Sequence, residues 1–289
     1  MSLSELIFKR LSSDSFLEEH LAKYAGIPAV FDTEFPGDQQ EGWGGMTQYP
    51  RICYRIDLQV NTERASTGQL HVTVYTERNS LIVDALEGSV KRCLKDVLIQ
   101  PSEEAPFCFA WSSTDPYVIE GMGVICRDLV FDILEYPLQE TTDPDPVMAV
   151  SWFVKSMYPE ALVIGIDRLE EFTEASKRPV FYCRLEDIQS TTGYCMNTIA
   201  WFISKVAIHL IYPNSVTRLK TVAAIQQKMA VETEIIMLDQ SPMAIQTLSM
   251  NNKADYLRSG QLVVTGKYGC LRGGEKKKGV LPHIAGFTR

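Results

Sequence analysis

The chain has few of the residues that mark a catalytic or metal centre. It contains only four histidines and seven cysteines among 289 residues. No Cys-x-x-Cys pair, His-Glu-x-x-His run or Gly-x-Ser-x-Gly elbow occurs in it. The cysteines are odd in number and most lie inside apolar runs, which argues against a disulfide framework or a zinc site. We therefore predict a protein without metal or cofactor that is not an enzyme.

A phosphate-binding loop is missing as well. Gly260, Gly266 and Lys267 resemble one at first sight, but five residues separate the two glycines and Tyr268 follows the lysine. A Walker loop has four residues between its glycines, and a serine or threonine follows its lysine. The spacing therefore argues against this class of nucleotide site.

Long apolar runs are also absent. Residues 199–212 come nearest, but Ser204, Lys205 and His209 interrupt them, whereas a membrane helix needs about 18 consecutive apolar residues. Residues 1–10 mix acids with bases and lack the apolar core of a signal peptide. We expect a chain that is cytoplasmic at synthesis and has no membrane partner.

The surplus of acidic residues limits the possible partners. The net charge is −8, whereas a general nucleic-acid binder needs a surplus of lysine and arginine to neutralise phosphates. We therefore predict no sequence-specific nucleic-acid partner. Residues 272–289 are the exception, with five basic residues against the single acid Glu275. This tail could contact a phosphate or an acidic surface, but we favour a disordered or partner-ordered end.

What the chain does contain is an internal duplication. Residues 50–56 read Pro-Arg-Ile-Cys-Tyr-Arg-Ile, and residues 179–185 read Pro-Val-Phe-Tyr-Cys-Arg-Leu. Each run is followed by an apolar run that ends in tyrosine and then by an Asn-Ser pair, Asn79-Ser80 in the first half and Asn214-Ser215 in the second. A helical pattern and a further strand pattern follow each pair. Corresponding landmarks are 129 to 137 residues apart, which indicates one supersecondary unit written twice.

Each half has its own pattern of helices and strands. In the first half, apolar spacing predicts helices within residues 3–24, broken near Asp14, and over residues 81–97, capped by Asn79 or Ser80. Strands are expected at residues 51–60, 69–78, 107–112 and 124–136. In the second half, helices are expected at residues 147–158 and 216–229, the latter capped by Asn214, and strands at residues 163–166, 179–188, 198–212, 243–250 and 261–268.

These elements predict an α+β fold with two tandem copies of an antiparallel sheet, each with helices packed on one face. The first domain is expected to span residues 1–136 and its duplicate residues 147–272. Residues 137–146 are rich in proline and acids and form the predicted linker. Residues 273–289 form the predicted flexible basic tail.

Three residues are candidate interface contacts. Arg55 and Arg184 hold the same place in the first strand of each repeat, as a symmetry-related interface pair would; the alternative is that each arginine packs its stem on its own sheet. Trp43 lies among glycines in residues 36–45, a predicted mobile loop, and is a candidate exposed anchor for a partner. His71 and His209 lie in corresponding strands, but a shared metal site would need a further ligand. We favour half-buried histidines bonded to neighbours.

The run Tyr49-Pro-Arg-Ile-Cys-Tyr-Arg, the run Gln69-Leu-His-Val-Thr-Val-Tyr-Thr and the Asn79-Ser80 pair before a helix resemble the tail-terminator or tail-completion proteins of long-tailed bacteriophages. The resemblance covers residues 16–136, with a weaker copy over residues 147–268. It implies a ring-forming structural protein without catalytic residues, at the head–tail joint or tail end of a virion or prophage-derived particle. Members of that family usually have one domain, whereas this chain has two.

A duplicated member would supply two ring positions per chain. Three copies would then give six pseudo-equivalent positions, joined by heterologous contacts that close into a ring. The expected partners are further copies of the chain, with a trimer as one ring, and other tail or head–tail proteins. Two alternatives stay open: a small-ligand-binding protein or enzyme with a site in the interdomain cleft, and a peptide-binding adaptor that uses the sheet edges.

Overall fold

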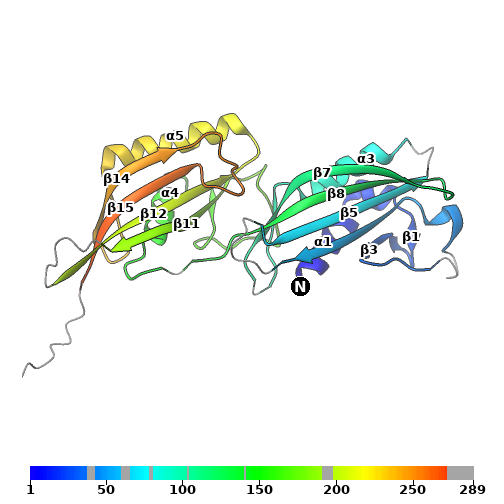
Figure 1. The fold of residues 1–289 in the computed structure, drawn as a ribbon, viewed down its shortest axis with the longest axis horizontal. Helices are drawn as coiled ribbons and strands as arrows, with labels where there is room; N and C mark the ends of the chain where they lie inside the picture. Colours follow the sequence, from blue (N-terminus) through cyan, green and yellow to red (C-terminus); the bar gives the residue numbers. More distant parts are fainter. Residues whose placement is uncertain are drawn as a thin grey trace, which may run out of the picture.

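The computed structural model describes residues 1–37, 43–59, 66–77, 81–102, 104–139, 141–190 and 198–271 (Figure 1). Two curled sheets follow one another along the long axis, and helices pack against both. Each sheet buries its own hydrophobic core together with its helices. The protein therefore has the predicted α+β fold, with two tandem sheet domains.

In its described ranges, the first half supplies six strands to the first sheet, together with a small separate hairpin, β1–β2. The strands predicted at residues 51–60 and 69–78 are β4 and β5, which pair antiparallel. Leu70, Val72 and Val74 on β5 are fully buried, because alternate residues of a strand point to the same face. The elements are α1 (Leu3–Ser12), α2 (Ser15–His20), β1 (Lys23–Tyr24), β2 (Ile27–Pro28), β3 (Val30–Asp32), the 3-10 helix η1 (Gly45–Gln48), β4 (Arg51–Leu58), β5 (Gly68–Glu77), α3 (Val83–Leu94), β6 (Val97–Ile99), β7 (Phe107–Ile119) and β8 (Val124–Glu135).

The second half repeats this plan with one additional strand, β10. Its core is built by α4 and α5 against one face of the second sheet. The elements are α4 (Pro146–Met157), β9 (Leu162–Val163), β10 (Phe172–Glu174), β11 (Val180–Ser190), β12 (Ile199–Ile211), α5 (Ser215–Glu232), β13 (Glu234–Ile236), β14 (Pro242–Met250) and β15 (Leu262–Leu271).

The two sheets share one topology. The strand order is β6-β7-β8-β5-β4-β3 in the first half and β13-β14-β15-β12-β11-β9 in the second. Helices precede the edge strand in both halves, α1 and α2 before β3 and α4 before β9, and one helix follows the hairpin β4–β5 or β11–β12, α3 or α5. Each sheet has one parallel pair, β3 with β4 and β9 with β11, so neither is wholly antiparallel as predicted. The duplication inferred from the sequence is thus present in the fold.

The helix break expected near Asp14 and the cap expected at Asn214 are both in place. Asp14 caps α2 and Asn214 caps α5, each by accepting a hydrogen bond from a backbone N–H. The prediction for α3 is wrong, because Ile82 holds its N-cap position without a side-chain hydrogen bond. Asn79 and Ser80 themselves lie outside the described residues. A turn precedes α3, so the helix begins two residues later than the apolar spacing predicted.

Candidate assembly interface

A continuous junction joins the two halves. β10, which comes between β9 and β11 in the sequence, pairs antiparallel with β6 and becomes an edge strand of the first sheet. Behind this pairing lies a core of apolar side chains that are at most 8% exposed. These side chains fill much of the space between the halves. They are Leu98, Cys108, Ala110, Leu134 and Tyr136 from the first half and Leu162, Ile164, Leu169, Ala175, Val180, Tyr182, Ile211 and Leu257 from the second.

At the start of β7, the first sheet is covered on both faces. Phe107 and Phe109 point into the core of the first half, whereas Cys108 and Ala110 point into the junction. A strand without polar alternation is typical of a sheet that is buried on both sides. The apolar run at residues 107–110 therefore needs the second half to cover its outer face.

Charged pairs at the rim fix how the halves meet. Arg10 on α1 donates to Oε1 of Glu174 on β10 at 3.0 Å, and both side chains are about one-quarter exposed. Arg258, in the connection between β14 and β15, donates to the carboxylate of Asp132 on β8. Each pair joins a residue of the first half to one of the second. The junction is therefore specified by charge as well as by apolar burial.

His209 is buried beside this junction. Its Nε2 accepts a hydrogen bond from Nε of Arg184 at 3.1 Å, and its ring lies against those of Tyr136 and Tyr182. Burial, reinforced by the positive charge of Arg184, lowers the pKa of His209 to about 4. The ring is therefore neutral at pH 7 and carries its proton on Nδ1. His71 instead lies 3.3 Å from Asp128 and is not brought near His209, so the two form no shared metal site.

Arg55 and Arg184 share one kind of contact but differ in their surroundings. Each pairs with a carboxylate two residues further along its own strand, Asp57 at 2.8 Å and Glu186 at 3.3 Å. Arg55 is exposed, whereas Arg184 is partly covered and bound to His209. These contacts hold each arginine on its own sheet. An interface role for the two remains a prediction.

Trp43 is 3% exposed, so the prediction of an exposed anchor is wrong. Its ring makes edge-to-face contacts with Tyr24 at 5.3 Å and Phe31 at 5.6 Å, and its Nε1 donates to the carbonyl of Pro36 at 3.2 Å. The neighbouring glycines suggested exposure. The aromatic partners come from β1 and β3, which the local sequence does not place beside Trp43.

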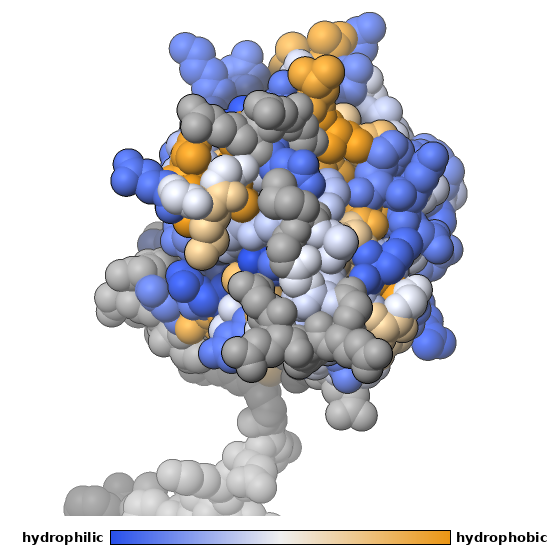
Figure 2. All heavy atoms as spheres, turned by 90° about the vertical axis from the view of Figure 1, so that its right-hand side faces the viewer, coloured by the Kyte–Doolittle hydropathy of each residue, from blue (hydrophilic) through white to orange (hydrophobic). Residues whose placement is uncertain are grey.

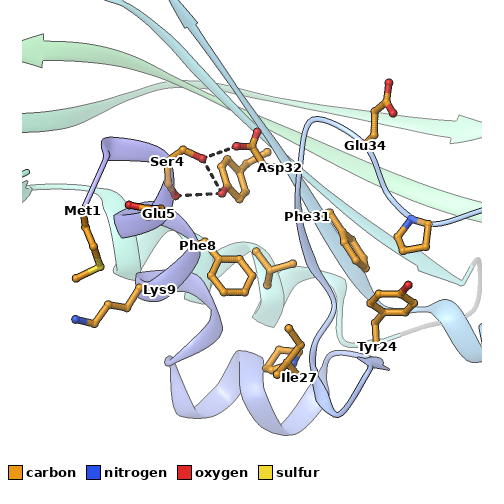
Figure 3. Close-up of a pocket in the computed structure, with 14 residues that line it drawn as sticks. Met1, Ser4, Glu5, Phe8, Lys9, Tyr24, Ile27, Phe31, Asp32 and Glu34 are labelled. Carbon is orange, nitrogen blue, oxygen red and sulfur yellow. Dashed lines mark hydrogen bonds between the residues drawn. The ribbon is translucent and has the colours of Figure 1, made fainter.

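A groove of about 760 Å³ lies on the surface of the first half, between α1 and β3 (Figure 3). Phe8 on α1 and Ile27 on the β1–β2 hairpin line it. Ser4 Oγ donates to the Asp32 carboxylate, and the Tyr54 hydroxyl donates to the Ser4 carbonyl at 3.1 Å. These bonds fix α1 against the edge of the sheet, so the groove has a defined shape.

The groove follows an open sheet edge. The Ala29 carbonyl and the Thr33 N–H both bond to β4, so the alternation of the parallel ladder turns the backbone groups of Val30 and Asp32 away from β4. Sequence reasoning missed this groove. Phe8 lies off the buried stripe of α1, and no local signal placed Ile27 opposite it.

The described thiols are not activated. All six cysteines within the described residues are free. Burial raises the pKa of Cys93 and of Cys183 to about 12, so both thiols are protonated and poor nucleophiles at pH 7. Among the residues that the structure describes, no group of three or more His, Cys, Asp and Glu side chains could hold a metal ion. None of the helices in the described ranges is long and apolar enough to cross a membrane.

Comparison with known proteins assigns no family. No family model matches the chain, and no curated protein is detectably similar to it in sequence. The fold, the junction and the surfaces are therefore the basis for a function.

Proposed function

We propose that the chain is a ring-forming structural protein of a phage or prophage-derived particle, of the tail-terminator or head–tail connector type, which acts by assembly and not by catalysis. The observation that carries the proposal is the repeated topology: two halves with the same strand order are joined head to tail in one chain. The sequence resemblance to single-domain tail terminators supplies the particle type.

The way in which the halves meet supports this proposal. The junction is heterologous, because the first half uses its β6 side and the second half uses β10 and the β14–β15 connection. Heterologous contacts between like units can be repeated, and they generate a closed ring when the rotation between units allows it. Three chains in such a ring would place six similar domains around a centre.

Electron microscopy of the purified full-length protein tests this proposal. Class averages should show closed rings with six similar lobes, related by threefold symmetry because alternate lobes come from different halves. Fields of isolated two-lobed particles at micromolar concentration would contradict the proposal.

The groove between α1 and β3 favours a second candidate function, a peptide-binding adaptor. Strand addition needs outward-facing backbone groups on an edge strand and space for side chains beside it. β3 is an edge strand with the groove beside it, and Val30 turns its backbone groups outward, whereas the Asp32 carbonyl already accepts a hydrogen bond from the Glu34 N–H at 2.6 Å. Ile27 is 49% exposed and lines the groove, so Ile27→Glu should abolish capture of an extended apolar peptide without unfolding the protein. Screening a random peptide library against the wild type and this variant tests the candidate. A library that yields no binder dependent on Ile27 would remove it.

A further inference from the structure

We infer that the junction between the two halves is repeated between chains, so that the free end of the first half of one copy docks on the free end of the second half of another. The inference rests on the proposed function and deepens it, because it names the two surfaces that would build the ring. The occupant of each surface is a second copy of this chain.

The topology identifies which surfaces correspond. Within the junction, the first half contributes its β6 side, and the second half contributes the connection between β14 and β15, where Tyr256 donates to Asp96 and Arg258 donates to Asp132. By strand order, β13 is the counterpart of β6, and the β7–β8 turn is the counterpart of the β14–β15 connection. β13 is the edge strand of the second sheet, next to β14, and the β7–β8 turn lies at the free end of the first half (Figure 1). The two free surfaces therefore correspond to β6 and to the β14–β15 connection of the junction, whereas the first half has no counterpart of β10 among the described residues.

The end of β7 and the β7–β8 turn carry apolar side chains in solvent. Tyr117, Val118 and Met122 are 44%, 50% and 64% exposed, and we call them the tip surface. Figure 2 looks onto this end of the molecule, where apolar side chains gather toward the top among polar ones. The corresponding β14–β15 connection instead buries Leu257 in the junction. Exposed apolar side chains at the β7–β8 turn are expected if the second half of another copy covers them in the assembly.

The opposite end also exposes apolar side chains. Ile236 and Leu238, at the end of β13 and just after it, are 52% and 57% exposed, and Leu271 at the end of β15 is 83% exposed; we call these three the β13 surface. β6 is covered by β10, whereas no strand among the described residues lies beyond β13. The second sheet therefore ends where the first sheet continues into a neighbouring half. This end has the place and the apolar character to accept the first half of another copy.

Single-site variants of the full-length chain separate the two surfaces. Met122→Glu places a charge on the tip surface, and Ile236→Glu places one on the β13 surface. Val216→Glu on α5 is the matched control, because Val216 is 61% exposed but lies on neither surface. All three residues are exposed, so the thermal midpoint of each monomer should stay unchanged. Light scattering then measures association of each variant beside the wild type.

We expect each end variant to raise the dissociation constant between chains by about tenfold or more, as a charge left unpaired in an apolar contact should, and the control to assemble as the wild type does. An equimolar mixture of the two end variants should form a complex of two chains and nothing larger, because each variant keeps one intact surface. The inference is overturned if the end variants assemble normally, or if the mixture stays monomeric or grows beyond two chains. A monomeric wild type would remove the proposed function as well, whereas an assembled wild type with unaffected end variants removes only this inference.

Discussion

Protonation of His209 is expected to destabilise the fold at mildly acidic pH. The pKa is 6.5 for a free histidine and about 4 in the folded chain, where burial and Arg184 disfavour the charged ring. Between these values the unfolded chain binds a proton that the folded chain does not, so the free energy of unfolding falls as the pH falls. The stability that depends on neutral His209 is fully present above pH 6.5 and is lost as the pH falls to about 4. At about 1.4 kcal/mol per pKa unit, the whole interval corresponds to about 3 kcal/mol.

Urea unfolding between pH 7.5 and pH 5, followed by circular dichroism, measures this effect. His209→Gln keeps an acceptor for Arg184 but cannot be protonated, so its free energy of unfolding should fall less than that of the wild type, by about 2 kcal/mol at pH 5. Parallel pH curves for the wild type and His209→Gln would refute the reasoning.

Substitutions at four further positions test the packing, the junction and a helix cap, each by urea unfolding at pH 7.5. Gly68→Ala should cost about 2 kcal/mol, because its Cβ would lie 2.2 Å from a backbone carbonyl oxygen of β4; Gly88→Ala, in open space on α3, should instead stabilise by about 0.5–1 kcal/mol. Equal effects of the two substitutions would contradict the backbone contact. Tyr136→Phe should cost about 1 kcal/mol, because it removes the hydrogen bond at 3.0 Å to the Leu257 carbonyl across the junction; an unchanged midpoint would mean that this bond contributes nothing. Asp145→Ala should cost about 1 kcal/mol, because the Asp145 carboxylate caps two N–H groups of α4, and Asp145→Asn should recover most of that loss.

The features that could be predicted from the sequence depend on local periodicity. The alternation of Leu70, Val72 and Val74 marks one strand, and the repeat of such patterns in the same order marks the duplication. The pairing of β10 with β6 could not be predicted, because it joins residues that are distant in sequence and the three residues of β10 carry no clear strand pattern. The burial of Trp43 depends in the same way on distant aromatic residues.

The outer face of the first sheet is an intermediate case. The sequence predicted a strand at residues 107–112, but its burial on both faces and the identity of the second half as the cover are visible only in the structure. The end surfaces could not be predicted either, since exposure of Met122 and Ile236 is visible only once the strands have been paired.

Association of the chain with itself is the central claim, and its mass in solution is the most direct test. Light scattering of the wild type across a tenfold dilution in the micromolar range should give a mass of three times the 32.6 kDa chain, or a higher multiple of it. The mass should decrease on dilution only if the ring dissociates. A mass of 32.6 kDa at every concentration would contradict the account.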